Sequence, residues 1–183
     1  LQLGFITPDG LFAFTGNAGK AESTGVEVEF ISRPTDGLTL TLNTSYIDAD
    51  IGEDVLNDFG DVIATSGNKI PFVPDFKVYA GVDYQFPMSD SWDGLVNVGY
   101  TYRGATYSDP ENTESEKNDS FGLVNMTVGA QTGRWGIFAF AKNLLNEEAT
   151  TYRQNLIGAL ALPIYSTYVR PRTIGVELRA NFD

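Results

Sequence analysis

The sequence predicts an all-β fold, a transmembrane antiparallel β-barrel, and three observations lead to this prediction. Apolar and polar side chains alternate along long runs, the connections between the runs alternate between short and long, and aromatic residues gather near the ends of the runs. Composition agrees, because 13% of the 183 residues are aromatic and 19 are glycine, a mixture that favours strands and turns. No stretch approaches the roughly 20 consecutive apolar residues that a membrane helix needs.

Seven runs show the alternation. The first extends roughly from Thr15 to Arg33 and stops at a turn formed by Pro34 to Gly37. The second, Leu38 to Tyr46, is the most regular, with leucines on one face and Thr, Asn and Ser on the other. The other five runs cover residues 76–86, 96–103, 124–130, 135–144 and 173–182. About seven antiparallel strands are therefore expected.

The sixth run, Trp135 to Leu144, has apolar residues on both faces. Ile137 and the neighbouring alanines lie on the same face as Trp135, whereas Phe138 and Phe140 lie on the opposite face. The pattern therefore predicts a strand here but does not assign its outward side.

A soluble β-sandwich binding or adhesive module is the alternative, because its strands also alternate in polarity. Run length and loop order favour the membrane. A strand that spans hydrocarbon needs about 9 to 11 residues, whereas soluble strands average about 5 to 6. Bacterial barrels also place tight turns at one end and long loops at the other, and close with an even number of strands. Seven strands cannot close a barrel, so further strands are expected outside this sequence, and Leu1 is expected to be an internal residue of a longer precursor.

Composition excludes several functions. Twenty-four acidic against 12 basic residues give a net charge of -12, which disfavours binding to nucleic acid. The absence of both Cys and His removes disulfides, thiolate chemistry and the commonest general base, so neither an enzyme, such as a lipid hydrolase, nor a cofactor is expected. Asp48, Asp50 and Asp54 are hard oxygen donors at close spacing, but Gly52 does not fit the calcium-loop pattern. A solvated loop is predicted there and no metal site.

Candidate ligand contacts lie where the runs meet the long connections, at the expected outer mouth. Guanidinium and aromatic side chains there have the chemistry to hold an anionic or aromatic ligand, although an aromatic girdle facing lipid explains the tyrosines more simply. The candidates are Arg103, Tyr107, Tyr152, Arg153 and Tyr165, with Tyr102 and Tyr168 beside them.

Several motifs resemble the late barrel strands of TonB-dependent receptors. The segment Asn17 to Ala49 resembles that family in its Asn-Ala-Gly-Lys-Ala start, its Gly-Val-Glu core and its Pro-x-Asp-Gly-Leu turn. IPFVPDFKVYAGVDYQF resembles a strand that follows a large outer loop, the segment from Lys142 to Glu147 resembles a characteristic strand end, and RPRTIGVELRANF resembles the closing strand. The resemblance extends from Asn17 to Phe182.

This resemblance implies a barrel of about 22 strands with an N-terminal plug domain, of which residues 1–183 would form a C-terminal portion without the plug. It implies an outer-membrane receptor that imports a scarce nutrient, such as a ferric siderophore, with TonB contacted through a segment outside this sequence. The long loops would be extracellular and the C-terminus periplasmic. The expected partners are membrane lipid, the plug, the remaining strands and the barrel-assembly machinery.

Two further sets of residues carry expectations, the first from the resemblance and the second from the alternation of the strands. The alternating residues at the C-terminus match the family's assembly signal, although Asp183 follows the terminal aromatic residue; they are Ile174, Val176, Leu178, Ala180 and Phe182. Charged residues at alternate strand positions are expected to line the lumen and contact the plug rather than the ligand; they are Glu27, Glu29, Lys77, Asp83, Arg103, Glu177 and Arg179.

Overall fold

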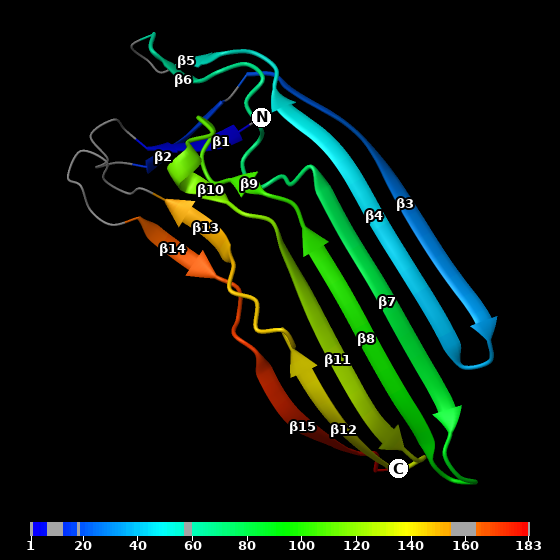
Figure 1. The fold of residues 1–183 in the computed structure, drawn as a ribbon. Helices are drawn as coiled ribbons and strands as arrows, with labels where there is room; N and C mark the ends of the chain where they lie inside the picture. Colours follow the sequence, from blue (N-terminus) through cyan, green and yellow to red (C-terminus); the bar gives the residue numbers. More distant parts are fainter. Residues whose placement is uncertain (1, 7–12, 18, 57–59, 155–163, 183) are drawn as a thin grey trace.

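The long alternating runs form one antiparallel sheet in the computed structural model, which describes residues 2–6, 13–17, 19–56, 60–154 and 164–182. The sheet has seven strands that follow one another in chain order, and every neighbouring pair is antiparallel (Figure 1). The strands are β3 (Ala21–Thr35), β4 (Leu38–Ile51), β7 (Phe76–Pro87), β8 (Asp93–Arg103), β11 (Phe121–Gln131), β12 (Trp135–Lys142) and β15 (Thr173–Ala180). The predicted all-β antiparallel fold is therefore confirmed.

The connections at one end of the sheet are short, and those at the other end are long and carry structure of their own (Figure 1). Among the described residues, four two-stranded hairpins and a 3-10 helix lie outside the sheet. They are β1 (Gln2–Ile6) with β2 (Ala13–Asn17), β5 (Val55–Leu56) with β6 (Val62–Ala64), β9 (Thr106–Tyr107) with β10 (Lys117–Asn118), β13 (Thr150–Gln154) with β14 (Tyr165–Tyr168), and η1 (Glu114–Glu116).

The first predicted run differs from the structure. Instead of one strand from Thr15 to Arg33, the chain forms β2, breaks, and starts β3 at Ala21. Gly19 lies in the break with φ of +55°, a left-handed conformation that glycine adopts without the steric cost of a side chain. The prediction of a single long strand was wrong because polar alternation continues through the break and hides it.

Cross-strand pairing gives the sheet two chemically different faces. One row of paired residues crosses the whole sheet and is apolar from β4 onward, in the order Leu40, Val82, Val98, Met126, Ala141 and Ile174. The next row on the opposite face consists mainly of polar or small residues, in the order Thr39, Asp83, Asn97, Thr127, Phe140 and Gly175. We call these the outer and inner faces.

The outer face is exposed rather than packed against protein. Val26, Phe30 and Leu178 keep 59%, 54% and 75% of their surface, and no second sheet covers this face within the described ranges. The only described side chain below 2% exposure is that of Ile51, which packs with Val55 at the β5–β6 hairpin, away from the middle of the sheet. A soluble sandwich would bury its apolar rows, so the described part of the chain does not support that alternative.

The sixth strand receives its orientation from β15. Trp135, Ile137, Ala139 and Ala141 pair with Ala180, Leu178, Val176 and Ile174, so this set lies on the outer face. Phe138, only 2% exposed, lies on the inner face against Gly129 and Gly136, with the Arg179 guanidinium 4.5 Å from its ring centroid. The two phenylalanines therefore cover glycine backbone, since Phe140 contacts Gly175 in the same way.

The β3–β4 turn depends on Gly37. Its φ is +75°, and a Cβ atom at this position would collide with the Gln85 carbonyl oxygen of the neighbouring strand. The Gly37 oxygen in turn accepts a 2.9 Å hydrogen bond from the Gln85 backbone N–H. Both the turn and the close strand approach therefore require glycine here.

The described helical structure is limited to η1, and none of it is long and apolar enough to cross a membrane.

Candidate functional site

The long connections are tied to one another at the far end of the sheet. We number them the first (52–75), second (104–120) and third (143–172) connections. Asn112 joins the first two, because its Oδ1 accepts a 2.6 Å hydrogen bond from the Lys69 backbone N–H and its Nδ2 donates to the Lys69 oxygen at 3.0 Å. Asn68 Nδ2 also donates to the Pro110 oxygen at 2.9 Å. The two connections therefore form one unit.

Phe72 lies at the centre of this unit. Its backbone N–H donates to the Tyr107 oxygen at 2.9 Å, and its ring stacks on Tyr152 of the third connection with centroids 5.8 Å apart and planes at 15°. The Arg103 guanidinium donates to its carbonyl oxygen at 3.4 Å. The φ of Phe72 is +64°, a conformation that costs a bulky residue roughly 1–2 kcal/mol. The surrounding contacts hold that strained conformation.

The third connection completes the cluster. The Tyr152 and Tyr165 rings meet edge to face with centroids 6.2 Å apart, and the Tyr152 hydroxyl donates to Gln154. The Arg153 backbone N–H donates to Ser108 Oγ at 3.0 Å, and its guanidinium lies 3.9 Å from the Asp119 carboxylate. The third connection is therefore fastened to the second through both backbone and side chain.

Tyr107 contributes a polar edge. Its hydroxyl donates to Glu114 at 3.4 Å, and the Lys117 ammonium lies 5.6 Å from its ring centroid. Lys117 also forms an ion pair with Glu114 at 3.1 Å, and this hydrogen bond raises the lysine pKa. The ring is held between strand β10 and helix η1.

The structure brings the five predicted candidates, Arg103, Tyr107, Tyr152, Arg153 and Tyr165, into one region around Phe72. Sequence reasoning missed Phe72 itself, although its position between Pro71 and Pro74 marked a constrained segment. The arrangement presents aromatic rings beside two guanidinium groups, which suits a flat or anionic ligand.

The second connection also carries an acidic group, formed by Asp109, Glu111 and Glu116. Burial of its carboxyl, followed by the nearby carboxylates of Asp109 and Glu116, raises the pKa of Glu111 to about 7. Asp109 is 8% exposed and accepts hydrogen bonds from the Thr113 backbone N–H. Although Glu111 as a whole residue is exposed, the negative charge of the buried Asp109 carboxylate raises the pKa of Glu111 independently of burial.

The acidic stretch considered for calcium is occupied by a lysine. The Lys69 ammonium lies 2.5 Å from Asp48, 3.2 Å from Asp50 and 3.3 Å from Asp75, and these carboxylates raise its pKa. Asp54 accepts a hydrogen bond from the Ser66 backbone N–H. Within the described residues no group of three or more acidic side chains could hold a metal ion.

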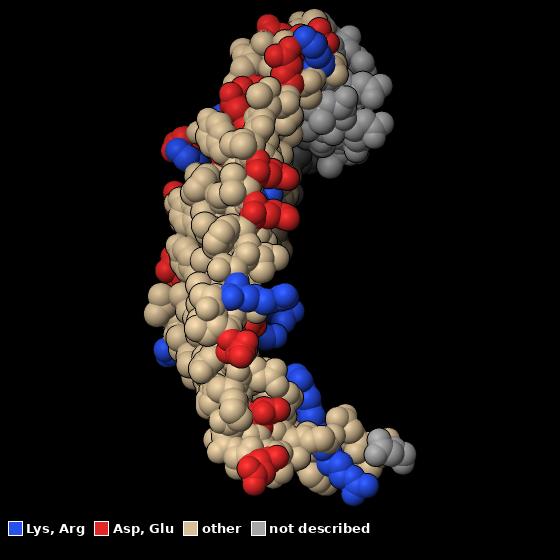
Figure 2. Space-filling view, turned by 90° about the vertical axis from the view of Figure 1, so that its right-hand side faces the viewer, with Lys and Arg blue, Asp and Glu red and all other residues tan. Residues whose placement is uncertain are grey.

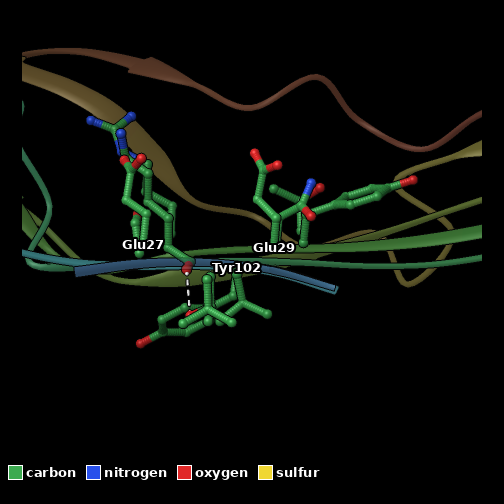
Figure 3. Close-up of a pocket in the computed structure, with 12 residues that line it drawn as sticks. Glu27, Glu29 and Tyr102 are labelled. Carbon is green, nitrogen blue, oxygen red and sulfur yellow. Dashed lines mark hydrogen bonds between the residues drawn. The ribbon is translucent and has the colours of Figure 1, made fainter. Parts of the chain in front are cut away.

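The predicted lumenal charges lie on the inner face, and the profile of the molecule is hollowed on the side where charged side chains protrude (Figure 2). Glu27, Lys77 and Arg103 share one cross-strand row on β3, β7 and β8, separated only by Ser45 of β4. These residues help to line a cavity of about 380 Å³. Figure 3 shows Glu27 and Glu29 on the side of the sheet opposite to Tyr102. The face is therefore polar where the outer face is apolar.

The other members of this set pair locally on the same face. Asn97 donates a hydrogen bond to the Asp83 carboxylate on the neighbouring strand, and Arg179 donates to Glu177 two residues away at 2.5 Å. These contacts leave no ligand-specific arrangement, consistent with a lining role.

A single curved sheet with one apolar and one polar face, sorted loops and a polar hollow is the pattern of a membrane β-barrel wall. The family model for the β-barrel of TonB-dependent receptor-like proteins matches residues 3–144. The chain belongs to this family.

Solved structures agree with the fold. The ferric yersiniabactin uptake receptor FyuA from Yersinia pestis superposes with a TM-score of 0.77 at 24% identity, covering 93% of this chain and 25% of that one. The siderophore receptor PiuA from Acinetobacter baumannii gives 0.66 at 17% identity, covering 86% and 21%. BauA, the ferric preacinetobactin receptor from the same species, gives 0.67 at 15% identity, covering 97% and 25%. The chain thus spans about a quarter or less of these proteins.

Proposed function

We propose that this chain is the C-terminal barrel portion, a single partial domain over residues 1–183, of a receptor that imports a ferric siderophore across the bacterial outer membrane. Family membership carries the proposal, and the named structural neighbours are receptors for siderophores. The apolar outer face supports a place in lipid, because Val26, Val28 and Phe30 have no protein cover within the described residues.

The sorted connections support one direction of insertion. In bacterial barrels the long loops are extracellular and the tight turns periplasmic. This orientation would place the Phe72 cluster outside the cell and Phe182 near the periplasm. The alternating residues Ile174 to Phe182 would serve as the assembly signal, and TonB would act through a segment outside this sequence.

The ligand would contact the aromatic and cationic groups at the mouth. Iron complexes of siderophores combine anionic oxygen donors with flat rings in many chemical classes, and guanidinium and aromatic groups attract both. Arg103 and Tyr152 are the strongest candidates, because both contact Phe72 and therefore belong to the same rigid unit.

Uptake by the full-length protein tests the proposal. Cells lacking the gene and starved of iron are expected to lose import of one radiolabelled ferric siderophore from a panel, and the intact gene should restore it. Import unchanged by the deletion for every siderophore tested would refute iron uptake as the function.

Site variants test the ligand contacts separately. Arg103→Gln combined with Tyr152→Ala is expected to weaken siderophore binding by about 100-fold if each contact contributes about 1.4 kcal/mol. Tyr84→Ala, an aromatic deletion on the outer face at the short-turn end, is the matched control and should leave binding unchanged. Equal binding by the double variant and the control would remove the mouth cluster from the ligand site while leaving the receptor assignment intact.

A further inference from the structure

Phe72 occupies a turn position that ordinarily belongs to glycine. The tight turn of residues 70–73 is closed by a 3.3 Å hydrogen bond from the Val73 backbone N–H to the Ile70 oxygen. Pro71 is the second residue of this turn, and Phe72, with φ of +64°, is the third. This is the pattern of a type II turn, whose third residue needs a positive φ and is therefore usually glycine or asparagine. A bulky aromatic residue at this position is a conformational outlier.

The turn is held in place through its backbone. The Ile70 N–H donates to the Ala49 oxygen of β4 at 3.1 Å, and the Phe72 N–H donates to the Tyr107 oxygen of β9 at 2.9 Å. The Phe72 oxygen also accepts a 3.4 Å hydrogen bond from the Arg103 guanidinium. Each of these bonds uses a backbone atom of the turn, so glycine in place of Phe72 would keep all of them. The phenylalanine ring is not needed to fix the turn.

The ring of Phe72 adds little net stability to the fold. The residue is 43% exposed and does not belong to the buried cluster around Ile51. Its ring stacks on Tyr152 with centroids 5.8 Å apart. A stack between two partly exposed rings stabilises by about as much as the strained backbone costs. A strained conformation that brings no gain in stability is a mark of functional sites, so the ring itself needs a function.

Phe72 lies where the inner face of the sheet meets the long connections. Arg103 is the last residue of β8 and shares the inner-face row with Glu27 and Lys77, and its guanidinium reaches the Phe72 oxygen. The first connection joins β4 to β7, so Phe72 has described strands on both sides and lies away from the open edges at β3 and β15. The ring therefore stands next to the upper end of the polar inner face.

An aromatic ring beside a guanidinium is complementary to an aryl ring that carries anionic oxygens. Rings attract one another in offset stacks, and a guanidinium donates to oxygens at the ring edge. The bonds of Arg103 to the Phe72 oxygen and to Thr106 Oγ1 are long, 3.4 and 3.5 Å, so a stronger acceptor can replace them. Phenolate and catecholate groups bind iron through ring oxygens and have both features, whereas hydroxamate and carboxylate groups have no ring.

We propose that Phe72 is the specificity-determining residue of the mouth, and that its ring stacks on a phenolate or catecholate ring of the imported ferric siderophore. This inference rests on the proposed function and narrows it to siderophores that carry an aryl ring. It assigns recognition of the ring to Phe72 and recognition of the ring oxygens to Arg103.

The first test compares classes of siderophore. Cells without the gene, and the same cells carrying the full-length gene, are given radiolabelled ferric complexes of the catecholate, phenolate, hydroxamate and carboxylate classes. Gene-dependent import is expected only for complexes with an aryl ring. Equal or greater gene-dependent import of a complex without a ring would overturn this inference and leave the proposed function intact. Import that depends on the gene for none of the complexes would refute the proposed function itself.

Binding of the imported aryl complex to the purified full-length receptor tests Phe72 directly. Phe72→Gly removes the ring and adopts the positive φ without steric cost, so the affinity should fall about tenfold, the upper end for a lost ring stack. Phe72→Tyr keeps a ring and should bind like the parent protein. Phe72→Leu keeps apolar bulk without a ring and should lose about as much as Phe72→Gly. Equal affinity of Phe72→Gly and the parent protein would overturn the proposal.

Phe76→Ala is the matched control, because Phe76 is 42% exposed but lies on the outer face of β7. It should leave siderophore binding unchanged. Hydrogen exchange of residues 66–72 separates recognition from folding. In Phe72→Gly the exchange should keep the rate of the parent protein, because the backbone bonds of the turn remain. Lost binding together with faster exchange in this segment would make Phe72 a structural residue and overturn the proposal.

Discussion

The strand region and the long-connection region of this molecule are stabilised by different kinds of contact. In the strand region the same antiparallel pairing repeats along all seven strands, with one face mainly apolar and the other mainly polar. In the connections, single residues such as Asn112 and Phe72 hold together segments 43 and 80 positions apart in the sequence. Many equivalent contacts therefore stabilise the sheet, which we call the wall, whereas the long connections at its far end, which we call the mouth, depend on a few individual side chains.

The largest expected effect comes from placing a charge on the outer face. Val82→Arg puts a guanidinium on the outer face near the middle of strand β7 and should destabilise the inserted protein by about 4 kcal/mol, the upper end for a barrel midplane. Urea unfolding of the full-length protein in lipid vesicles, followed by gel mobility, measures this. Thr101→Arg, on the inner face, is the control and should cost less than about 1 kcal/mol; equal losses would contradict the assignment of the two faces.

A smaller loss is expected on removing the aromatic cover of the inner face. Phe138→Ala uncovers the backbone of Gly129 and Gly136 and removes the ring that the Arg179 guanidinium contacts. The free energy of unfolding should therefore fall by about 3 kcal/mol. Ile137→Ala, one residue away on the outer face and 49% exposed, should cost about 1 kcal/mol. The same unfolding assay checks both, and a larger effect at Ile137 would show that Phe138 is not the packing residue.

The mouth should respond locally. Asn112→Gly preserves the positive φ but loses both hydrogen bonds to Lys69. The free energy of local opening of the first connection should therefore fall by about 1 to 2 kcal/mol. Hydrogen exchange of residues 66–72 measures the opening, while exchange in β7 and β8 stays unchanged. Asn112→Asp keeps the acceptor for the Lys69 N–H and should show an intermediate rate. Faster exchange throughout the sheet would show that the wall also depends on Asn112.

The smallest effect is a pH dependence of the mouth. Because the pKa of Glu111 is raised to about 7 from 4.5, the folded second connection binds the proton more tightly than the unfolded one. This contribution to stability is fully present below about pH 4.5 and is lost as the pH rises through about 7. Exchange of residues 106–118 should therefore accelerate between pH 5 and 7.5 after correction for intrinsic rates. In Glu111→Gln this acceleration should disappear; its persistence would assign the effect to another group.

The strand region was largely predictable from the sequence, because a period of two repeated over eight or more residues leaves little choice of face. All seven sheet strands were expected near their observed positions. The sixth strand needed its neighbours, since apolar residues occupy both of its faces and only the pairing with β15 shows that Phe138 and Phe140 face inward. The break at Gly19 was missed because it does not interrupt the alternation.

For the mouth, the sequence predicted only which residue types gather there and not how the connections fold. Tyrosine and arginine near the strand ends indicated the right region, but the segments that form the hairpins β5–β6, β9–β10 and β13–β14 were predicted only as long connections. Their order comes from contacts between distant segments, such as Phe72 with Tyr152, which no local pattern encodes. The positive φ of Phe72 and Asn112 likewise follows from those contacts.

The sheet ends on β3 and β15, each with one edge of backbone groups that pairs with no other described strand. Hydrocarbon offers no alternative donor or acceptor, so each such edge in a bilayer would cost several kcal/mol per unpaired group. An attempt to excise these residues as an independent module would therefore give a product that seeks a substitute strand, from a second copy or from any extended peptide. Engineering should therefore exchange the connections and leave the two sheet edges untouched.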